Sequence, residues 1–315
     1  MGAMSTAVVF EQPGEMALRP VQLPEPHSTD CVVEVHWTGI STGTERLLWD
    51  GRMPPFPGLA YPLVPGYESV GCIASSGPEA GLAVGQRVFV PGSRGFTDVQ
   101  GLFGGAARSL VVPAERLIPL PSELDSTGVL LALAATACHA LRRMEDLGAP
   151  ELIIGHGALG RLLARATEAR YQVSPMVWET SAERREGDHS YPVVDPAADD
   201  RRDYLRVCDV SGANTIIDQT VAHLAKGATV LLAGFYAAPI HFEFPAAFMR
   251  EIDIRISAEW QPEDMQAALQ LVAGGDLSLN GIITHDHPFD SAEKAYKQAF
   301  SDPRCLKMIL DWRDA

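Results

Sequence analysis

Cysteine is scarce in this chain and is never paired along the sequence. The five cysteines among 315 residues stand far apart, with no C-x-x-C pair (Cys31, Cys72, Cys138, Cys208 and Cys305). This spacing argues against a structural zinc lobe and against a disulfide framework. It is typical of a reducing compartment, so we expect a cytoplasmic protein.

The sequence also lacks a long apolar run and an excess of positive charge. No run reaches the ~18 apolar residues of a membrane span, and no signal-peptide pattern opens the chain. Lys and Arg number 25 against 40 Asp and Glu, which gives a formal net charge of −15. Because that charge repels phosphate-rich partners, we expect no nucleic-acid binding, and we expect no membrane span.

Two successive patterns of apolar residues divide the chain. Short apolar runs such as "CVVEVHWTG" and "GQRVFVPG", separated by Gly/Pro turns up to about residue 120, predict an irregular β-barrel. A helical period opens at "STGVLLALAATACHAL", with Ser126 as N-cap. Strands then alternate with helices such as "NTIIDQTVAHLAKG", which predicts a parallel sheet and an α/β fold class. We expect domains over residues 1–122 and 123–277, followed by a tail over 278–315.

Glycines in "ELIIGHGALGRLLARA" indicate a dinucleotide site. They fit G-x-G-x-x-G between an apolar strand and a helix, although an ordinary tight turn is the alternative. The helix N-terminus offers N–H groups and the positive end of its dipole to phosphates. The predicted loop consists of Gly155, His156, Gly157, Ala158, Leu159 and Gly160.

An acidic residue, Glu179, ends the next apolar run, about 20 residues further on, where an acid accepts from the adenosine ribose 2′-hydroxyl. It would repel a 2′-phosphate, so we expect NAD rather than NADP. Arg184 and Arg185 follow shortly after Glu179, and they argue for NADP. Gly212 and Gly234 end later strands at the carboxyl edge of the sheet, where the nicotinamide is expected.

Several motifs resemble the medium-chain dehydrogenase/reductase superfamily over essentially the whole chain. "VPGYESVG" is similar to its P-G-H-E-x-x-G segment, "GQRV" to its G-D-x-V and "ATACHAL" to its T-x-x-x-A-L helix. The resemblance implies a GroES-like β-barrel catalytic domain, a Rossmann domain and a C-terminal segment that returns to the catalytic domain. It also implies that Thr136 and His139 face the cofactor side.

Zinc members of that superfamily carry ligands that this sequence lacks. Ser41 or Thr42 stands in place of their loop cysteine, and Tyr67 in place of their G-H-E histidine. The apolar run "LLALAA" occupies the position of the third ligand. Because zinc needs soft or imidazole ligands, we expect no metal here.

More narrowly, "GISTGTERLLWDGRMPPFPGLAYPLVPGYESVG" and "GHGALGRLLARA" resemble the 3-hydroxyethyl bacteriochlorophyllide a dehydrogenases of bacteriochlorophyll biosynthesis. The resemblance implies oxidation of the C3 1-hydroxyethyl group of a (bacterio)chlorophyllide to an acetyl group, with NAD⁺ as hydride acceptor. The Pro-stiffened loop would stack aromatic side chains on a large planar ligand, namely Trp49, Phe56 and Tyr61. The alternative is a loop that packs on its own domain.

Oxidation of an alcohol without zinc requires side chains that take the hydroxyl proton. The hydroxyls of "GISTGTE" would form a relay ending at Glu45 or Glu68, and Tyr67 would hold the substrate oxygen. The alternative for Glu68 is a buried acid paired with an arginine across the domain cleft. The candidate catalytic residues are Ser41, Thr44, Tyr67, Glu68 and His139.

Other residues leave two interpretations open. His139 is either catalytic or a satisfied core histidine. Trp260 either walls the substrate pocket or fills core or a subunit interface. His285 and His287 in "THDHP" are expected to be structural rather than metal ligands.

Two rival functions accompany the dehydrogenase hypothesis. One is a zinc-free quinone or enoyl reductase, which usually favours NADPH and against which Glu179 argues. The other is a non-catalytic dinucleotide- or pigment-binding protein, which only turnover distinguishes from an enzyme. The expected partner is the pigment substrate, and the oligomeric state is left open, with a homodimer as the candidate.

Overall fold

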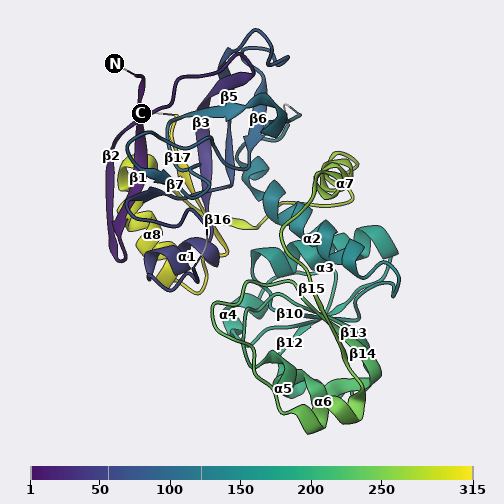
Figure 1. Ribbon diagram of the computed structural model, residues 1–315. Helices are drawn as coiled ribbons and strands as arrows, with labels where there is room; N and C mark the ends of the chain where they lie inside the picture. The colour runs from purple at the N-terminus through teal and green to yellow at the C-terminus, as the bar shows by residue number, and fades with distance from the viewer. Residues whose placement is uncertain (1, 56, 122, 314–315) are drawn as a thin grey trace. The chain divides into compact units, whose positions relative to one another are not determined.

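The computed structural model describes residues 2–55, 57–121 and 123–313. The chain forms two compact units (Figure 1). The barrel unit consists of Met1–Ala132 and Ile283–Ala315, and the Rossmann unit consists of the continuous span Leu133–Ile282. The last part of the chain therefore belongs with the first part.

Two sheets of mostly antiparallel strands form the barrel unit. One has the order β2-β1-β4-β7, and the other has the order β16-β17-β3-β5-β6-β9, with β8 also paired to β3. β1 is buried on both faces from Ala7 to Phe10, which places it in the core. The strands are β1 (Met4–Gln12), β2 (Glu15–Gln22), β3 (Asp30–Ile40), β4 (Leu63–Val64), β5 (Ser69–Ser76), β6 (Arg87–Val90), β7 (Gln100–Gly101), β8 (Ser109–Pro113), β9 (Ile118–Pro119), β16 (Ile283–Pro288) and β17 (Lys307–Asp311).

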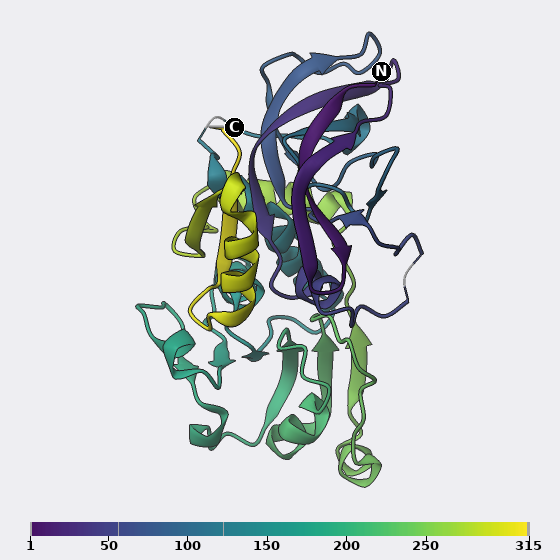
Figure 2. The ribbon, with the colours of Figure 1, turned by 90° about the vertical axis from the view of Figure 1, so that its left-hand side faces the viewer.

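The C-terminal segment completes the barrel unit. β17 pairs antiparallel with β3, with Ile309 opposite Gly39, and in Figure 2 the yellow C-terminal segment lies beside the purple N-terminal strands. Helix α8 buries Ala292, Ala295 and Tyr296 at helical spacing against the barrel core. The helical segments of this unit are α1 (Thr44–Trp49), α8 (Ala292–Ser301) and the 3-10 turns η1 (Ala114–Arg116), η2 (Ser126–Leu130) and η5 (Phe289–Ser291).

A parallel sheet forms the centre of the Rossmann unit. Its order, β12-β11-β10-β13-β14-β15, is the 3-2-1-4-5-6 order of a dinucleotide-binding fold. α2 and α3 lie on one side of this sheet, and α5 and α6 lie on the other (Figure 1). The strand order reverses between β10 and β13, and ligands of such folds bind beyond the carboxyl ends of the strands at that point.

The strands of the Rossmann unit are β10 (Leu152–Ile154), β11 (Met176–Trp178), β12 (Val193–Val194), β13 (Tyr204–Asp209), β14 (Leu224–Leu232) and β15 (Asp253–Ile256). Its helical segments are α2 (Leu131–Arg143, which begins at the end of the barrel unit), α3 (Ala158–Tyr171), α4 (Ala182–Arg185), α5 (Ile216–Thr220), α6 (Phe244–Arg250), α7 (Pro262–Ala273), η3 (Pro196–Ala198) and η4 (Val221–His223).

The structure corrects several local expectations. Asp125, not Ser126, caps the 3-10 turn η2, because its side chain accepts from the Thr127 N–H. This turn packs on β3 and β5, so the barrel unit extends to Ala132 rather than to residue 122, and its tail begins at Ile283 rather than at 278. The helix expected over residues 214–227 ends with η4, and β14 begins at Leu224.

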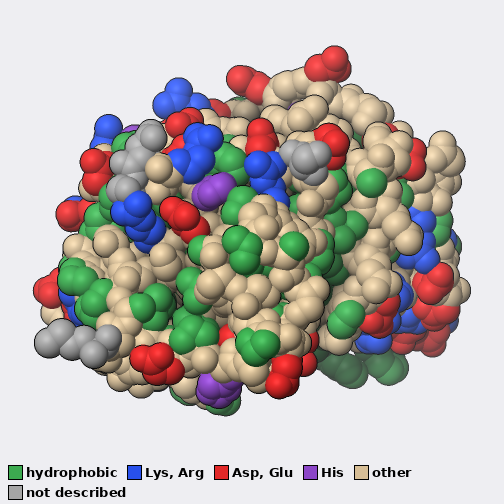
Figure 3. All heavy atoms as spheres, turned by 90° about the horizontal axis from the view of Figure 1, so that it is seen from above, with side chains coloured by type: hydrophobic (Ala, Val, Ile, Leu, Met, Phe, Trp, Pro, Cys, Tyr) green, Lys and Arg blue, Asp and Glu red, His purple; other side chains and the backbone are tan. Residues whose placement is uncertain are grey.

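No helix of the described residues is long and apolar enough to cross a membrane. On the face drawn in Figure 3, acidic and basic side chains are interspersed, with hydrophobic side chains between them. The net charge of −15 is therefore not gathered into one acidic patch on that face.

Candidate active site

The glycine loop lies between β10 and α3 in the Rossmann unit. Gly155 has φ +100°, a conformation that other residues rarely adopt. A Cβ at Gly160 would overlap the Gly155 carbonyl oxygen, so a side chain there would push α3 away from the loop. A Cβ at Gly157 would meet no atom within 4 Å. The main chain at Gly157 therefore borders open space.

This open space lies at the N-terminus of α3. Gly157 is the N-cap of α3, and no side chain of the described residues caps it. The first N–H groups of α3 therefore lack side-chain partners and carry the positive end of the helix dipole. Ala158 and Leu159 begin this helix, so the predicted loop residues lie together at its N-terminus.

Glu179 directly follows β11, beside the glycine loop. It is 7% exposed, and its carboxylate accepts the His156 N–H at 2.9 Å and the Ser181 N–H at 2.8 Å. The guanidinium of Arg185 donates to the main-chain oxygens of Glu179 and Thr180 at 2.8 Å. That head group is therefore engaged with its own loop.

The carboxyl ends of β13 and β14 bring the other predicted glycines together. A Cβ at Gly234 would lie 3.1 Å from the Gly212 nitrogen. The last residue of β13, the fully buried Asp209, is an acid that sequence reasoning missed. Ser211 O–H donates to Asp209 Oδ1 at 2.6 Å and Tyr236 O–H donates to Oδ2, while burial raises the pKa of this carboxyl. The sequence feature that could have identified Asp209 is its position at the end of the strand sequence "VCD".

Three hydroxyl groups meet in the barrel unit. Tyr67 O–H donates to Ser41 Oγ at 2.9 Å, and Thr44 O–H donates to the same oxygen at 3.0 Å. The Thr44 and Tyr67 oxygens are 3.1 Å apart. Burial raises the pKa of the Tyr67 phenol, so it stays protonated at neutral pH. The "GISTGTE" stretch is a turn that leads into α1. Ser41 lies before the helix, and Thr44, three residues later, is its first residue.

Glu45, in the first turn of α1, is buried behind this hydroxyl group cluster. Its carboxylate accepts the Ser41 N–H at 3.0 Å and the Tyr296 O–H at 2.8 Å. Burial raises the pKa of Glu45 to about 7, although both hydrogen bonds act in the opposite direction. Tyr296 lies on α8, so the C-terminal segment supplies one of the two partners.

Glu68 forms a buried ion pair, as in the alternative given for it, but with a different partner. Lys307 Nζ lies 2.5 Å from Glu68 Oε2, and the two side chains are 3% and 0% exposed. The partner is therefore a lysine of the same unit, not an arginine across a domain cleft, because β17 pairs with β3 beside Glu68. A Cβ at Gly39 would overlap Glu68 Oε2. Glu68 Oε1 is buried without a hydrogen-bond partner among the described residues.

His139 is held by neighbours in the Rossmann unit. Its Nδ1 lies 2.7 Å from Asp264 Oδ2, and Arg142 donates to both oxygens of the same carboxylate at 2.7 and 2.9 Å. Asp264 also belongs to the capping box of α7. The structure therefore favours the satisfied core histidine over the catalytic one. Thr136 lies one turn earlier on α2 and is half-buried.

The aromatic side chains of the predicted pigment loop pack on their own unit. Trp49 contacts Phe10 edge-on with ring centroids 5.6 Å apart, and Tyr61 O–H donates to the Leu48 carbonyl at 2.5 Å. This packing favours the alternative given for the loop. Phe56 lies outside the described residues. Trp260 is half-buried just before α7, and its role stays a prediction.

The histidines of "THDHP" lie on β16. His285 Nε2 is 3.7 Å from Asp302, and His287 Nε2 is 3.1 Å from Gln298 Oε1. The described residues contain no group of three or more His, Cys, Asp or Glu side chains that could hold a metal ion.

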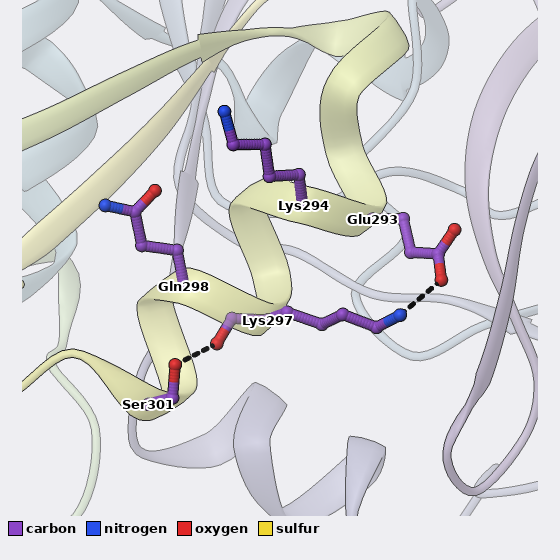
Figure 4. Close-up of a pocket in the computed structure, with 5 residues that line it drawn as sticks. All are labelled: Glu293, Lys294, Lys297, Gln298 and Ser301. Carbon is purple, nitrogen blue, oxygen red and sulfur yellow. Dashed lines mark hydrogen bonds and ion pairs between the residues drawn. The ribbon is translucent and has the colours of Figure 1, made fainter.

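A shallow hollow on α8 does not resemble a catalytic site. Figure 4 shows its lining side chains, which all come from this one helix (Glu293, Lys294, Lys297, Gln298 and Ser301). Its dashed lines mark the Glu293–Lys297 ion pair at 2.6 Å and the hydrogen bond from the Ser301 hydroxyl to the Lys297 carbonyl at 2.8 Å. An exposed ion pair one turn apart is typical of a solvated helix face.

Comparisons with known proteins show the family of this chain. Residues 27–122 match the alcohol dehydrogenase GroES-like domain. The chain is 53% identical to the 2-desacetyl-2-hydroxyethyl bacteriochlorophyllide A dehydrogenase of Cereibacter sphaeroides. The match covers 98% of this chain and 98% of that protein. The chain belongs to this family. As a member of the bacteriochlorophyllide dehydrogenases, it is an alcohol dehydrogenase of the medium-chain type, with a GroES-like domain and a Rossmann domain.

Solved structures confirm the fold expected for this dehydrogenase family. An alcohol dehydrogenase of E. coli CFT073 complexed with NADH is 20% identical with a TM-score of 0.83, and the match covers 99% of this chain and 100% of that one. A zinc-binding dehydrogenase of Sinorhizobium meliloti 1021 bound to NADP is 21% identical with a TM-score of 0.80, covering 98% and 100%. Proteins of this fold therefore bind either dinucleotide.

Proposed function

We propose that this protein oxidises the C3 1-hydroxyethyl group of a bacteriochlorophyllide to an acetyl group, with NAD⁺ as hydride acceptor and without catalytic zinc. Its 53% identity to a relative named for this substrate supports the pigment. The observation that carries the cofactor is the glycine loop with Glu179 beside it, hydrogen-bonded to the loop N–H of His156. A dinucleotide supplies the hydride acceptor when bound, and the loop residues would hold its phosphates.

The choice of NAD⁺ follows from the charge at Glu179. A fixed carboxylate accepts hydrogen bonds from a ribose diol and repels a 2′-phosphate. The Arg185 head group, one of the two arguments for NADP, is engaged with main-chain oxygens and with Asp195 at 3.0 Å. We therefore favour NAD⁺ over NADP⁺.

In the barrel unit, the hydroxyls of Ser41, Thr44 and Tyr67 would hold the alcohol oxygen. Tyr67 and Thr44 donate to Ser41 Oγ, which leaves the Ser41 hydroxyl hydrogen to be donated elsewhere. That hydrogen is therefore available to a substrate oxygen. Thiolate and imidazole ligands are replaced here by hydroxyls, and this replacement supports chemistry without zinc.

Of the two candidate acids, Glu45 is the better proton acceptor. Its pKa of about 7 matches neutral conditions, whereas Lys307 holds Glu68 in an ion pair. No hydrogen bond within the described part of the chain joins either carboxylate to a hydroxyl of Ser41, Thr44 or Tyr67. Proton transfer to Glu45 therefore requires a water molecule or a small movement of Ser41.

Turnover of the isolated pigment tests this proposal. The purified protein is mixed with a 3-hydroxyethyl bacteriochlorophyllide and NAD⁺ in the presence of a chelator, and the pigment absorption band is followed. Formation of the acetyl group extends the conjugation and moves the band to the red. We expect kcat/KM at least ~10-fold higher with NAD⁺ than with NADP⁺, which corresponds to about 1.4 kcal/mol.

Each part of the proposal fails on a separate result. No band shift with either dinucleotide would overturn the pigment reaction. Equal use of NAD⁺ and NADP⁺ would overturn the role of Glu179. Loss of activity together with one zinc per chain would overturn the metal-free mechanism.

A further inference from the structure

His156, the residue between the first two glycines of the loop, is fully buried. The loop itself needs only its main chain for phosphates, so a histidine side chain at this place calls for its own explanation. The ring lies edge-on to His189, with centroids 4.6 Å apart, and edge-on to Tyr191 at 5.7 Å. It therefore reaches from the glycine loop to the segment that follows Glu179.

Both ring nitrogens of His156 have partners on that segment. Nδ1 lies 2.8 Å from the Arg184 carbonyl oxygen, and Nε2 lies 3.1 Å from the Tyr191 hydroxyl. A carbonyl oxygen only accepts, so Nδ1 carries the hydrogen, and Nε2 accepts from the tyrosine. Burial lowers the pKa of His156 to about 3, which keeps the ring neutral at neutral pH.

A second side chain, Arg161 of α3, binds the same carbonyl. Its Nη2 donates to the Arg184 carbonyl oxygen at 3.0 Å, and its Nε donates to the His156 carbonyl oxygen at 3.3 Å. Arg161 is 8% exposed, and burial lowers the pKa of its guanidinium. Because a charged group costs free energy to bury, the two hydrogen bonds from Arg161 to main-chain oxygens of the loop and the turn indicate a positional use.

The held segment is also the one that fixes the Glu179 carboxylate. Ser181 N–H donates to Glu179 Oε1, and Ser181 Oγ accepts the Arg184 N–H at 3.3 Å. The Arg184 carbonyl, bound by His156 and Arg161, therefore lies in the same turn that supplies one of the two Glu179 donors. The other donor is the N–H of His156 itself. Movement of this turn would withdraw the Ser181 donor and leave the carboxylate held only on the His156 side.

We propose that His156 and Arg161 are positioning residues that clamp the turn Ser181–Arg184 and so hold Glu179 toward the ribose of the bound dinucleotide. The clamp sets the discrimination between NAD⁺ and NADP⁺, and this inference rests on the cofactor site of the proposed function. Asparagine at 156 places its amide N–H near the former Nδ1, whereas glutamine places its amide near the former Nε2. The two substitutions therefore separate the bond to Arg184 from the bond to Tyr191.

The test measures Kd for NAD⁺ and NADP⁺ by calorimetry on the full-length protein without pigment, together with Tm. For His156→Ala we expect a Kd for NAD⁺ about 10-fold higher and a Kd for NADP⁺ changed by less than about 2-fold, because the fixed acid helps only NAD⁺. His156→Asn restores most of the NAD⁺ affinity, and His156→Gln does not. The matched control, His189→Ala, removes a ring contact but no bond to Arg184, and it changes either Kd by less than about 2-fold.

Three results would overturn the inference. The first is wild-type discrimination in His156→Ala, whatever its Tm. The second is equal weakening of both dinucleotides that follows the loss of Tm across all variants, which indicates a purely structural role. The third is rescue by glutamine rather than asparagine. Wild-type protein that binds neither dinucleotide would instead refute the proposed cofactor use, and the clamp with it.

Discussion

Two buried carboxylates in the barrel unit are stabilised in different ways. Glu45 has hydrogen bonds from one main-chain N–H and one tyrosine, and its pKa rises to about 7. Glu68 instead faces the ammonium group of Lys307 at 2.5 Å. Glu45 can therefore bind and release a proton near neutral pH. Glu68 depends on the charge of Lys307, because a buried carboxylate does not easily find another partner.

At the scale of single residues, Lys307→Met should destabilise the protein by about 3–5 kcal/mol, because Glu68 then remains buried and unpaired. The free energy of unfolding is measured by urea denaturation. The double variant with Glu68→Gln should recover more than half of the loss, since it removes the buried charge.

The control for this prediction is Lys297→Met, which breaks the exposed pair with Glu293 on α8. Its effect should stay within about 0.5 kcal/mol, as for most surface pairs. If Lys307→Met were as mild as this control, the ion pair with Glu68 would have no structural importance.

At the scale of elements, two glycines of one loop should respond differently to alanine. Gly160→Ala should lower Tm, because its Cβ would overlap the Gly155 carbonyl oxygen and separate α3 from β10. Gly157→Ala should leave Tm unchanged, because its Cβ meets no protein atom within 4 Å and its φ of −75° suits alanine. It should nevertheless weaken NAD⁺ binding at least ~10-fold, since the Cβ would occupy the space of the phosphates.

Thermal unfolding and calorimetric titration check this pair of variants. Full NAD⁺ affinity in Gly157→Ala would show that the phosphates do not bind against this glycine. An unchanged Tm in Gly160→Ala would show that α3 has room to move.

Local spacing explains which elements the sequence could predict. The glycine loop lies within six residues, between a strand and a helix that each have a clear period, so its position followed from the sequence. Helix α1 has six residues, too few to show a period, so "GISTGTE" indicated only a turn. In residues 214–227 the helical spacing continues past His223, but pairing of Leu224 with Tyr204 makes the next residues a strand.

The partners of the buried acids could not be predicted, because they come from distant parts of the chain. Glu68 and Lys307 are 239 residues apart, and Glu45 and Tyr296 are 251 apart. Only the pairing of β17 with β3 and the packing of α8 bring them together. The hydroxyl cluster could be predicted in part. Ser41 and Tyr67 are 26 residues apart, and their motifs could be compared with a known metal-ligand pattern.

At the scale of the whole molecule, removal of residues 303–315 should unfold the barrel unit and spare the Rossmann unit. The truncated chain lacks β17, so β3 loses a partner strand and Glu68 loses Lys307. All strands of the parallel sheet lie within the continuous span Leu133–Ile282. Limited proteolysis should therefore leave a resistant fragment close to that span. Resistance of the whole truncated chain, equal to that of the full-length protein, would contradict this prediction.

The pairing of β3 with β17 also has a consequence for synthesis on the ribosome. β3 emerges early, whereas its partner strand is made roughly 190 residues after β8, a delay of about 10–40 s at ordinary translation rates. During that interval the Trp37–Ile40 end of β3 offers free N–H and C=O groups along one edge, which other chains can pair with. The Rossmann unit is complete before β17 exists. A chain that stops early therefore has a finished nucleotide fold but an open barrel, and only full-length chains close it.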